Sequence, residues 1–142
     1  MMVKKARVKW AGDMTFIGES SSGHAVVMDS GSDDGGLDHG IRPMEMLLLG
    51  AGGCASIDVM LMLQKSRQKV TDAWVELEAE RAPEPPRVFT KIHMHFVITG
   101  VDIDPRRVER AIALSQEKYC SASVQLAALS EITTDFEIIE PA

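Results

Sequence analysis

Residues 43–67 read PMEMLLLGAGGCASIDVMLMLQKSR, and this stretch decides the fold. Pro43 suits a first helical position, because its missing N–H would have no partner there. From Met46 to Leu63 the only charged residue is Asp58, so a helix over this stretch must be buried nearly all round. One copy of a 142-residue chain can hardly cover such a helix. We therefore expect a homodimer in which two such helices lie between sheets.

The residues before this helix predict three short strands. Residues 4–10, 14–19 and 24–29 show extended patterns, and short polar connections at 11–13 and 20–23 separate them. This is typical of a meander with two tight turns. Residues 30–40 are rich in Gly, Asp and Ser, which predicts a surface loop.

The residues after the helix predict two more strands, two helices and a last strand. Alternating apolar residues predict strands over 72–80 and 88–99, and the prolines in 82–86 interrupt the pairing. Asp104 followed by Pro105 predicts a helix start. The apolar stripe of that helix reaches Tyr119, and its earlier members are Val108, Ala111, Ile112 and Ser115. A shorter helix over 121–129 and a strand over 131–139 complete the chain.

The predicted order is βββα followed by ββααβ, which indicates an α+β fold with antiparallel sheets in one domain, 1–142. The length and the 45% hydrophobic and 25% charged residues are those of an ordinary globular domain.

The net charge of −6 argues against nucleic acid and anionic membranes as partners, because both call for a basic surface. The basic residues 1–10 are not followed by an apolar segment, so we expect no secretory signal and a cytoplasmic location.

The two cysteines are the first candidates for chemistry. In a reducing compartment a lone pair of cysteines is rarely a structural disulfide, so reactive thiols and inert buried thiols are the two alternatives. Cys54 follows Gly50, Gly52 and Gly53, which cost helix stability and allow close approach of a helix or a ligand. Cys120 lies where two helical pieces meet, and a helix N-terminus together with Lys118 would stabilise its thiolate.

Four other polar side chains need a role. Glu45 near the helix start is favoured by the helix dipole. Asp58, one turn beyond Cys54, is expected to have a partner because an unpaired buried carboxylate is costly. His93 and His95 share a strand face, and we expect no acidic or cysteine cluster to accompany them, which favours a solvated face over a metal site. We predict no metal and no cofactor.

Two segments resemble the OsmC/Ohr family, in its YhfA-like branch. Residues 42–47 and 52–59 read RPMEML and GGCASIDV and look like the family's central helix with its reactive cysteine, and residues 114–121, LSQEKYCS, look like its second cysteine segment. Residues 85–91, PPRVFTK, are similar to the YhfA-like branch. The resemblance covers nearly the whole chain and implies an intertwined homodimer, with each sheet built from both subunits.

The resemblance also implies a thiol-dependent peroxidase acting on organic hydroperoxides in oxidative-stress defence. Cys54 would be the peroxidatic cysteine, Cys120 the resolving cysteine and Glu45 the third catalytic residue. A lipoyl group or a thioredoxin-like dithiol would then reduce the Cys54–Cys120 disulfide. The candidate supporting or charge-partner residues are Asp58, Glu117 and Arg87.

Two positions depart from the Ohr pattern. The first hairpin turn, residues 11–15, has no arginine to hold a thiolate, and Arg87 or Arg7 is the candidate replacement. Met44 occupies the place of the family glutamate, with Glu45 one position later and about 100° further round the helix.

The alternative function is a non-catalytic dimer that senses redox state or binds an apolar small molecule. Methionine suits adaptable pockets, and this helix carries Met44, Met46, Met60 and Met62.

Overall fold

Three short strands, joined by tight turns, form the first sheet. The structure is a computed structural model that describes residues 2–142. The chain divides into two compact units, residues 1–47 and 48–142. In the first unit β1 (Ala6–Trp10), β2 (Phe16–Ser20) and β3 (Ala25–Met28) pair antiparallel in the order β1-β2-β3. This confirms the predicted meander.

The loop after β3 is tied down by a buried carboxylate. Asp29 is almost fully buried, and it accepts hydrogen bonds from the Thr15 hydroxyl at 2.9 Å and from the backbone N–H groups of Ser30 and His39 at 2.7 and 3.1 Å. A short 3₁₀ turn, η1 (Ser32–Asp34), lies within the loop. The predicted surface loop therefore has a defined path.

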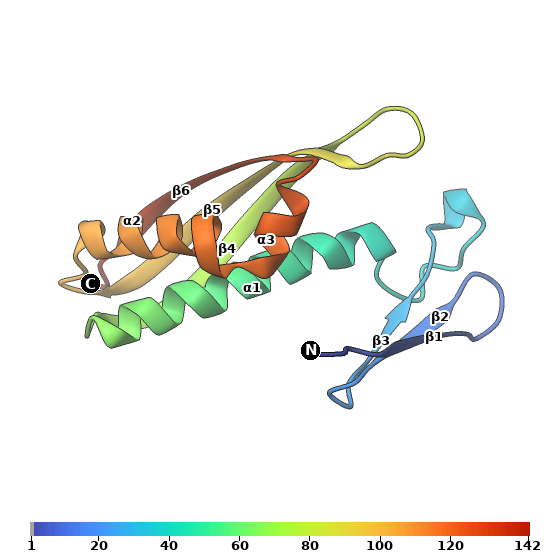
Figure 1. Cartoon of the computed structure of the whole chain (residues 1–142), viewed down its shortest axis with the longest axis horizontal. Coiled ribbons are helices and arrows are strands. Elements are labelled where there is room, and N and C mark those ends of the chain that lie inside the picture. The colour runs from blue at the N-terminus through green and yellow to red at the C-terminus, as the bar shows by residue number, and fades with distance from the viewer. Residues whose placement is uncertain (1) are drawn as a thin grey trace. The chain divides into compact units, whose positions relative to one another are not determined.

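The second unit is built on a sheet of three long strands (Figure 1). These are β4 (Lys69–Arg81), β5 (Phe89–Val101) and β6 (Glu131–Ile139), in the order β4-β5-β6. β4 and β5 pair antiparallel, as predicted, and β6 has the predicted bounds. β5 and β6 pair parallel, which departs from the antiparallel pattern. The reason is that helices connect these two strands and carry the chain back to the end from which β5 started.

Helices cover one face of this sheet. α1 (Pro43–Lys65) begins in the first unit and continues into the second, and α2 (Pro105–Leu114), the π-helical segment η2 (Ser115–Tyr119) and α3 (Ser121–Leu126) follow β5. Asp104 caps α2 by accepting from the N–H of Arg106 at 2.9 Å, as the sequence predicts. The core between helices and sheet consists of Ala51, Ala55, Val59 and Leu63 of α1, Val108, Ala111 and Ile112 of α2, and Ile92, Met94, Phe96 and Ile98 of β5.

Gly52 explains part of the glycine-rich turn before Cys54. A Cβ at this position would lie 2.8 Å from Leu77 and 3.3 Å from Val75, so glycine lets α1 pack closely on β4. Gly50 and Gly53 have nothing within 4 Å. Their backbone is open to a further molecule, as the sequence predicts for part of this turn.

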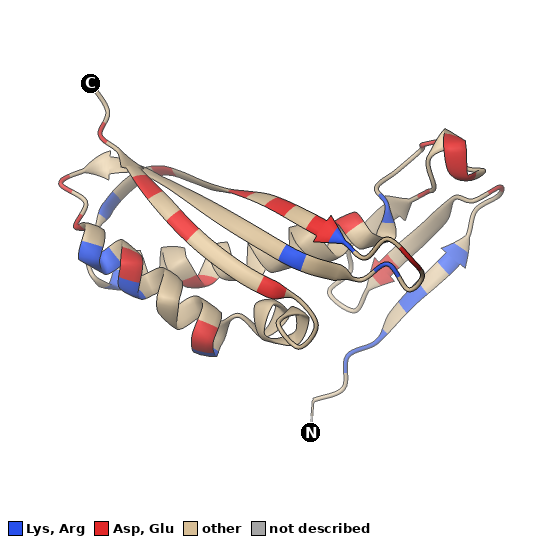
Figure 2. Ribbon diagram, turned by 90° about the horizontal axis from the view of Figure 1, so that it is seen from above, with Lys and Arg blue, Asp and Glu red and all other residues tan. Residues whose placement is uncertain are grey.

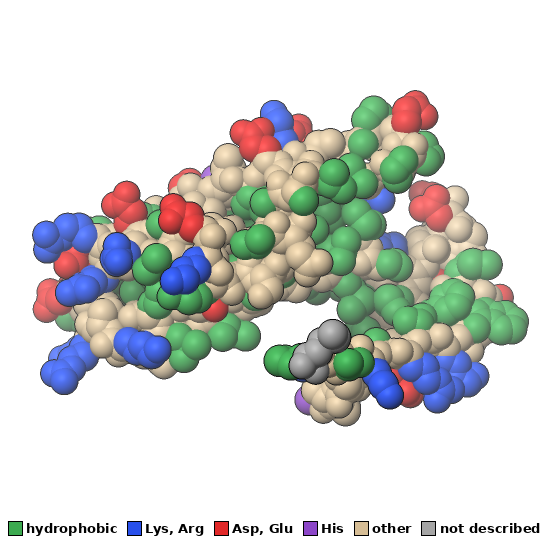
Figure 3. Space-filling model, viewed as in Figure 1, with side chains coloured by type: hydrophobic (Ala, Val, Ile, Leu, Met, Phe, Trp, Pro, Cys, Tyr) green, Lys and Arg blue, Asp and Glu red, His purple; other side chains and the backbone are tan. Residues whose placement is uncertain are grey.

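As the sequence predicts, a single copy of the chain does not bury α1. Only 28% of its most apolar 18-residue window is buried, and Leu49, Ile57 and Leu61 are 62%, 64% and 50% exposed. Hydrophobic side chains are visible along the course of α1 in Figure 3. By length and composition α1 could also cross a membrane, but core helices of soluble proteins share this property, so the finding is weak evidence. Complete burial of α1 requires a surface that one copy of residues 2–142 does not supply.

The prediction for Tyr119 is wrong, since its side chain is 50% exposed. The cause is the wide turn of η2, in which the N–H of Cys120 bonds to the carbonyl of Ser115 at 2.7 Å, five residues back. The extra residue shifts the phase of the helix. Cys120 rather than Tyr119 therefore follows Ser115 on the buried side.

Candidate functional site

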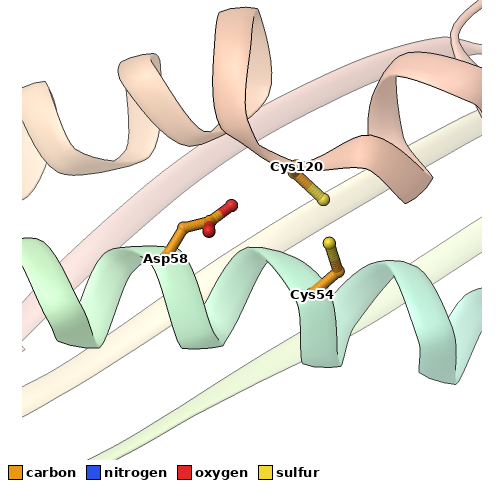
Figure 4. Close-up of side chains that lie close together, drawn as sticks. All are labelled: Cys54, Asp58 and Cys120. Atoms are coloured by element: carbon orange, nitrogen blue, oxygen red, sulfur yellow. The ribbon is translucent and has the colours of Figure 1, made fainter. Parts of the chain in front are cut away.

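The structure brings the two cysteines together (Figure 4). Cys54 projects from the middle of α1, and Cys120 projects from the junction of η2 and α3. The two sulfurs and a carboxylate oxygen of Asp58 all lie within 4.8 Å of one another. Both cysteines are free thiols, with Cys120 fully buried and Cys54 partly exposed. The site therefore holds a buried thiol, a reachable thiol and a carboxylate.

The polar contacts of Cys120 come from the backbone around it. It is the N-cap residue of α3, and its sulfur accepts from the N–H of Ser123 at 3.3 Å. Its thiol donates to the carbonyl of Ala51 at 3.9 Å. Burial raises the pKa of the Cys120 thiol, Ser123 opposes this through its hydroxyl and N–H, and Cys54 adds to it, so the pKa lies above its ordinary value.

The helix start predicted at Cys120 is present, but the predicted help from Lys118 is not seen. The ammonium group of Lys118 lies over the ring of Tyr119, 5.3 Å from its centroid. Among the described residues, no lysine or arginine is one of the largest influences on the pKa of Cys120. The largest effects that favour the thiolate of Cys120 are the hydrogen bonds from Ser123.

Asp58 has the partner that its position on α1 requires. The hydroxyl of Ser115, itself fully buried, donates to one carboxylate oxygen of Asp58 at 3.2 Å. The partner that the sequence predicts for Asp58 is thus a hydroxyl of the same chain. Since Ser115 also accepts the N–H of Cys120 through its carbonyl, this serine connects Asp58 to the second cysteine.

The remaining predicted site residues lie elsewhere in the fold. Glu45 accepts the backbone N–H of Arg42 at 2.8 Å, which closes the first turn of α1 as in a capping box. Glu117 is exposed on η2, and Arg87 is exposed in the β4–β5 connection, where its carbonyl accepts from Arg81 at 2.9 Å. The roles predicted for Glu45, Glu117 and Arg87 stay predictions.

Sequence reasoning missed a polar cluster on the other face of the β4–β6 sheet. His93 bonds to the Thr133 hydroxyl at 2.7 Å and to Asp135 at 3.0 Å, and His95 bonds to the same Asp135 oxygen at 2.7 Å and to Glu137 at 3.0 Å. Figure 2 shows that acidic residues recur along the strands on both sides of β5. The statement that no acidic cluster accompanies the histidines is therefore wrong in three dimensions.

The carboxylates beside His95 favour the protonated form of this histidine. The hydrogen bonds to Asp135 and then to Glu137 raise the pKa of His95, and His95 lowers the pKa of Asp135 in return. The signal that could have found the cluster is the matching alternation of polar residues in strands β5 and β6. It becomes visible only once the two strands are paired in parallel register.

Comparisons with known proteins agree with this fold. The sequence model of a family described as "OsmC-like protein" matches residues 33–135. The chain is 48% identical to "Protein YhfA" of Escherichia coli K12 over 135 residues, which cover 95% of this chain and 98% of that protein. A crystal structure of a hypothetical protein from Aquifex aeolicus matches all of both chains with a TM-score of 0.88 and 28% identity.

A more distant structure shares the fold alone. An organic hydroperoxide resistance protein from Elizabethkingia anophelis matches with a TM-score of 0.72 at 15% identity, covering 99% of this chain and 98% of that one. The α+β fold class and the element order predicted from the sequence are thereby confirmed.

Proposed function

The chain belongs to the OsmC-like protein family, and on that premise we propose that it is a thiol-dependent peroxidase that reduces organic hydroperoxides in oxidative-stress defence. The observation that carries the proposal is the meeting of Cys54 and Cys120, from two separate elements, within 4.8 Å. Two sulfurs this close need only small side-chain rotations to form a disulfide. The 48% identical relative from E. coli supports the family, and the organic hydroperoxide resistance protein from Elizabethkingia anophelis, which shares the fold at 15% identity, supports the reaction.

The proposed cycle assigns one step to each thiol. The Cys54 thiolate attacks the O–O bond of the hydroperoxide, takes one oxygen to become a sulfenic acid, and with a proton releases the alcohol. The thiol of Cys120 then condenses with this sulfenic acid, which forms the disulfide and releases water. A small dithiol, such as a lipoyl group or a thioredoxin-like protein, reduces the disulfide by exchange and is itself oxidised.

The exposures of the two sulfurs fit these roles. Cys54 is partly exposed and can meet a substrate, whereas Cys120 is buried and can meet only Cys54. The raised pKa of Cys120 keeps this thiol protonated until the sulfenic acid forms. Premature oxidation of the resolving cysteine is thereby disfavoured.

The test is hydroperoxide consumption by the purified protein with dihydrolipoamide as the reductant and cumene or tert-butyl hydroperoxide as the substrate. We expect turnover by the unaltered protein, none by Cys54→Ser, and unchanged turnover by His93→Gln, whose imidazole lies on the opposite face of the sheet. Consumption that persists in Cys54→Ser, or that is absent from the unaltered protein, contradicts the proposal.

A second candidate is a redox sensor that forms the same disulfide without turnover. It is favoured by the hairpin turn 11–15, which contains no arginine that could hold the attacking thiolate. A cation beside a thiolate speeds its attack. If the protein is a sensor, we expect each chain to consume one equivalent of hydroperoxide and to form a disulfide that dihydrolipoamide fails to reduce.

We also propose that the protein is a cytoplasmic homodimer formed through α1. The exposed residues Gly50, Gly53, Ile57 and Leu61 recur at intervals of three and four, so they form one stripe along the helix. An apolar stripe with open glycines matches a second copy of itself, because a two-fold interface places the same surface on both subunits. The cytoplasm, as a reducing compartment, would keep both cysteines as thiols.

A further inference from the structure

The sequence predicts no metal, but the structure brings Cys54, Asp58 and Cys120 into a group that has the chemistry of a metal site. Two sulfurs and a carboxylate oxygen are ligands that zinc and similar divalent cations accept in proteins. We propose that the reduced protein binds one divalent cation of the zinc type through Cys54, Cys120 and Asp58. This binding needs no hydroperoxide and is independent of the proposed turnover.

The spacing of the three ligand atoms fits such an ion after a small contraction. In a tetrahedral site with Zn–S bonds of about 2.3 Å and Zn–O bonds of about 2.0 Å, neighbouring ligand atoms lie roughly 3.5 to 3.8 Å apart. The three atoms lie within 4.8 Å of one another before any ion draws them together. Side-chain rotations that move each atom by about 1 Å or less close this gap.

The ligands come from elements that are already held in place. Cys54 and Asp58 are one turn apart on α1, which puts both on the same side of a rigid helix. Cys120 faces them from the end of η2, whose position is set by the bond from its N–H to Ser115. A site that spans two fixed elements loses little conformational freedom when it binds.

The groups around the ligands support a metal thiolate. Ser115 donates to one carboxylate oxygen of Asp58, which orients the group and leaves the other oxygen for an ion. The N–H of Ser123 bonds to the Cys120 sulfur and its hydroxyl also favours the charged form of that sulfur, and this buried hydroxyl has no other partner among residues 2–142. Because a fully buried thiolate without a counter-ion is costly, a divalent cation would remove the largest obstacle to ionising Cys120.

Binding and disulfide formation exclude each other. On binding, two thiols lose their protons to solvent and each sulfur bonds to the ion. On oxidation, the two sulfurs bond to one another, two of the three ligands are lost and the ion leaves. Three protein ligands also leave a fourth position open, which is the pattern of reactive rather than purely structural zinc sites.

The test is a titration of the reduced protein with Zn²⁺ against a chromophoric zinc indicator under anaerobic conditions, with Cd²⁺ as a second probe for thiolate-to-metal charge-transfer absorption. We expect one ion per chain, no binding by Cys54→Ser or Cys120→Ser, and at least about a tenfold loss of affinity in Asp58→Asn and in Ser115→Ala. The double variant His93→Gln and His95→Gln is the matched control, because it removes the other cluster of imidazoles and should leave affinity unchanged.

The unaltered protein supplies a test that does not depend on the folding of any variant. Oxidation of the pair to a disulfide with diamide should abolish binding, and reduction should restore it. Binding that survives this oxidation, loss of binding in the histidine control, or no binding to the reduced protein at micromolar zinc overturns the inference. Each of these results leaves hydroperoxide turnover untouched, and a protein that binds zinc but consumes no peroxide would overturn only the proposed function.

Discussion

Replacing Ile57 by alanine should weaken the proposed dimer without disturbing the fold of each subunit. Ile57 is 64% exposed in the single chain. Full burial of such a side chain contributes about 1.5–3 kcal/mol, so covering the exposed part contributes about 1–2 kcal/mol per subunit. Two-fold symmetry doubles this to about 2–4 kcal/mol for the dimer, or a roughly 30- to 700-fold weaker association.

The assay is sedimentation velocity over a dilution series of the reduced protein. Alanine is a better helix former than isoleucine, so α1 itself should not be weakened. Val101→Ala is the matched control, because Val101 is also an exposed apolar residue, 47% exposed, but lies at the end of β5. A monomeric unaltered protein, or a dimer equally strong in Ile57→Ala, refutes the reasoning from the exposed stripe.

Three further predictions concern other parts of the fold. The pKa of His95 is raised mainly by Asp135, so its imidazolium stabilises the fold fully below the ordinary pKa of 6.5. This stabilisation is lost as the pH rises through the raised pKa. The difference in urea midpoint between the unaltered protein and His95→Gln should therefore be largest below pH 6.5 and shrink above it. In Cys120→Ser the sulfenic acid of Cys54 has no resolving thiol. Mass spectrometry after hydroperoxide treatment should therefore find Cys54 over-oxidised to the sulfinic acid. An intact sulfenic acid at Cys54 would argue against the pairing of the two cysteines. Gly100→Ala should lower the free energy of unfolding by about 1–3 kcal/mol in urea denaturation. The reason is that the added Cβ meets a backbone carbonyl of β4 that cannot move aside. An unchanged urea midpoint would show that β4 moves to make room.

Sequence patterns predicted the elements of this fold well, because each signal is local. Pro43 and the apolar run after it marked α1, and the alternation over 131–139 marked β6 at its observed bounds. Residues 4–10 contained the first strand, and residues 14–19 contained the second except for its last residue, Ser20, for the same reason. Periodicity and turn residues are read within a few positions, so they need no knowledge of partners.

The parts that sequence missed depend on what packs against what. The exposure of Tyr119 follows from a wide turn that a regular 3.6-residue period does not anticipate. The contacts of His95 with Asp135 required the parallel register of β5 and β6, which no local pattern carries. Likewise, the meeting of Cys54 and Cys120 followed only from the family resemblance, since their separation along the chain predicts no contact.

The wide turn of η2 makes the placement of the second thiol depend on one residue of extra length. If residues 115–119 wound as a regular α-helix with no residue removed, Tyr119 would follow Ser115 on the buried side and Cys120 would lie about 100° further round. A deletion of one residue between Ser115 and Cys120 would remove the wide turn and leave the cysteine four residues after Ser115, on the side where it lies now. Descendants of this chain can therefore lose the wide turn together with one residue and still keep a two-thiol chemistry.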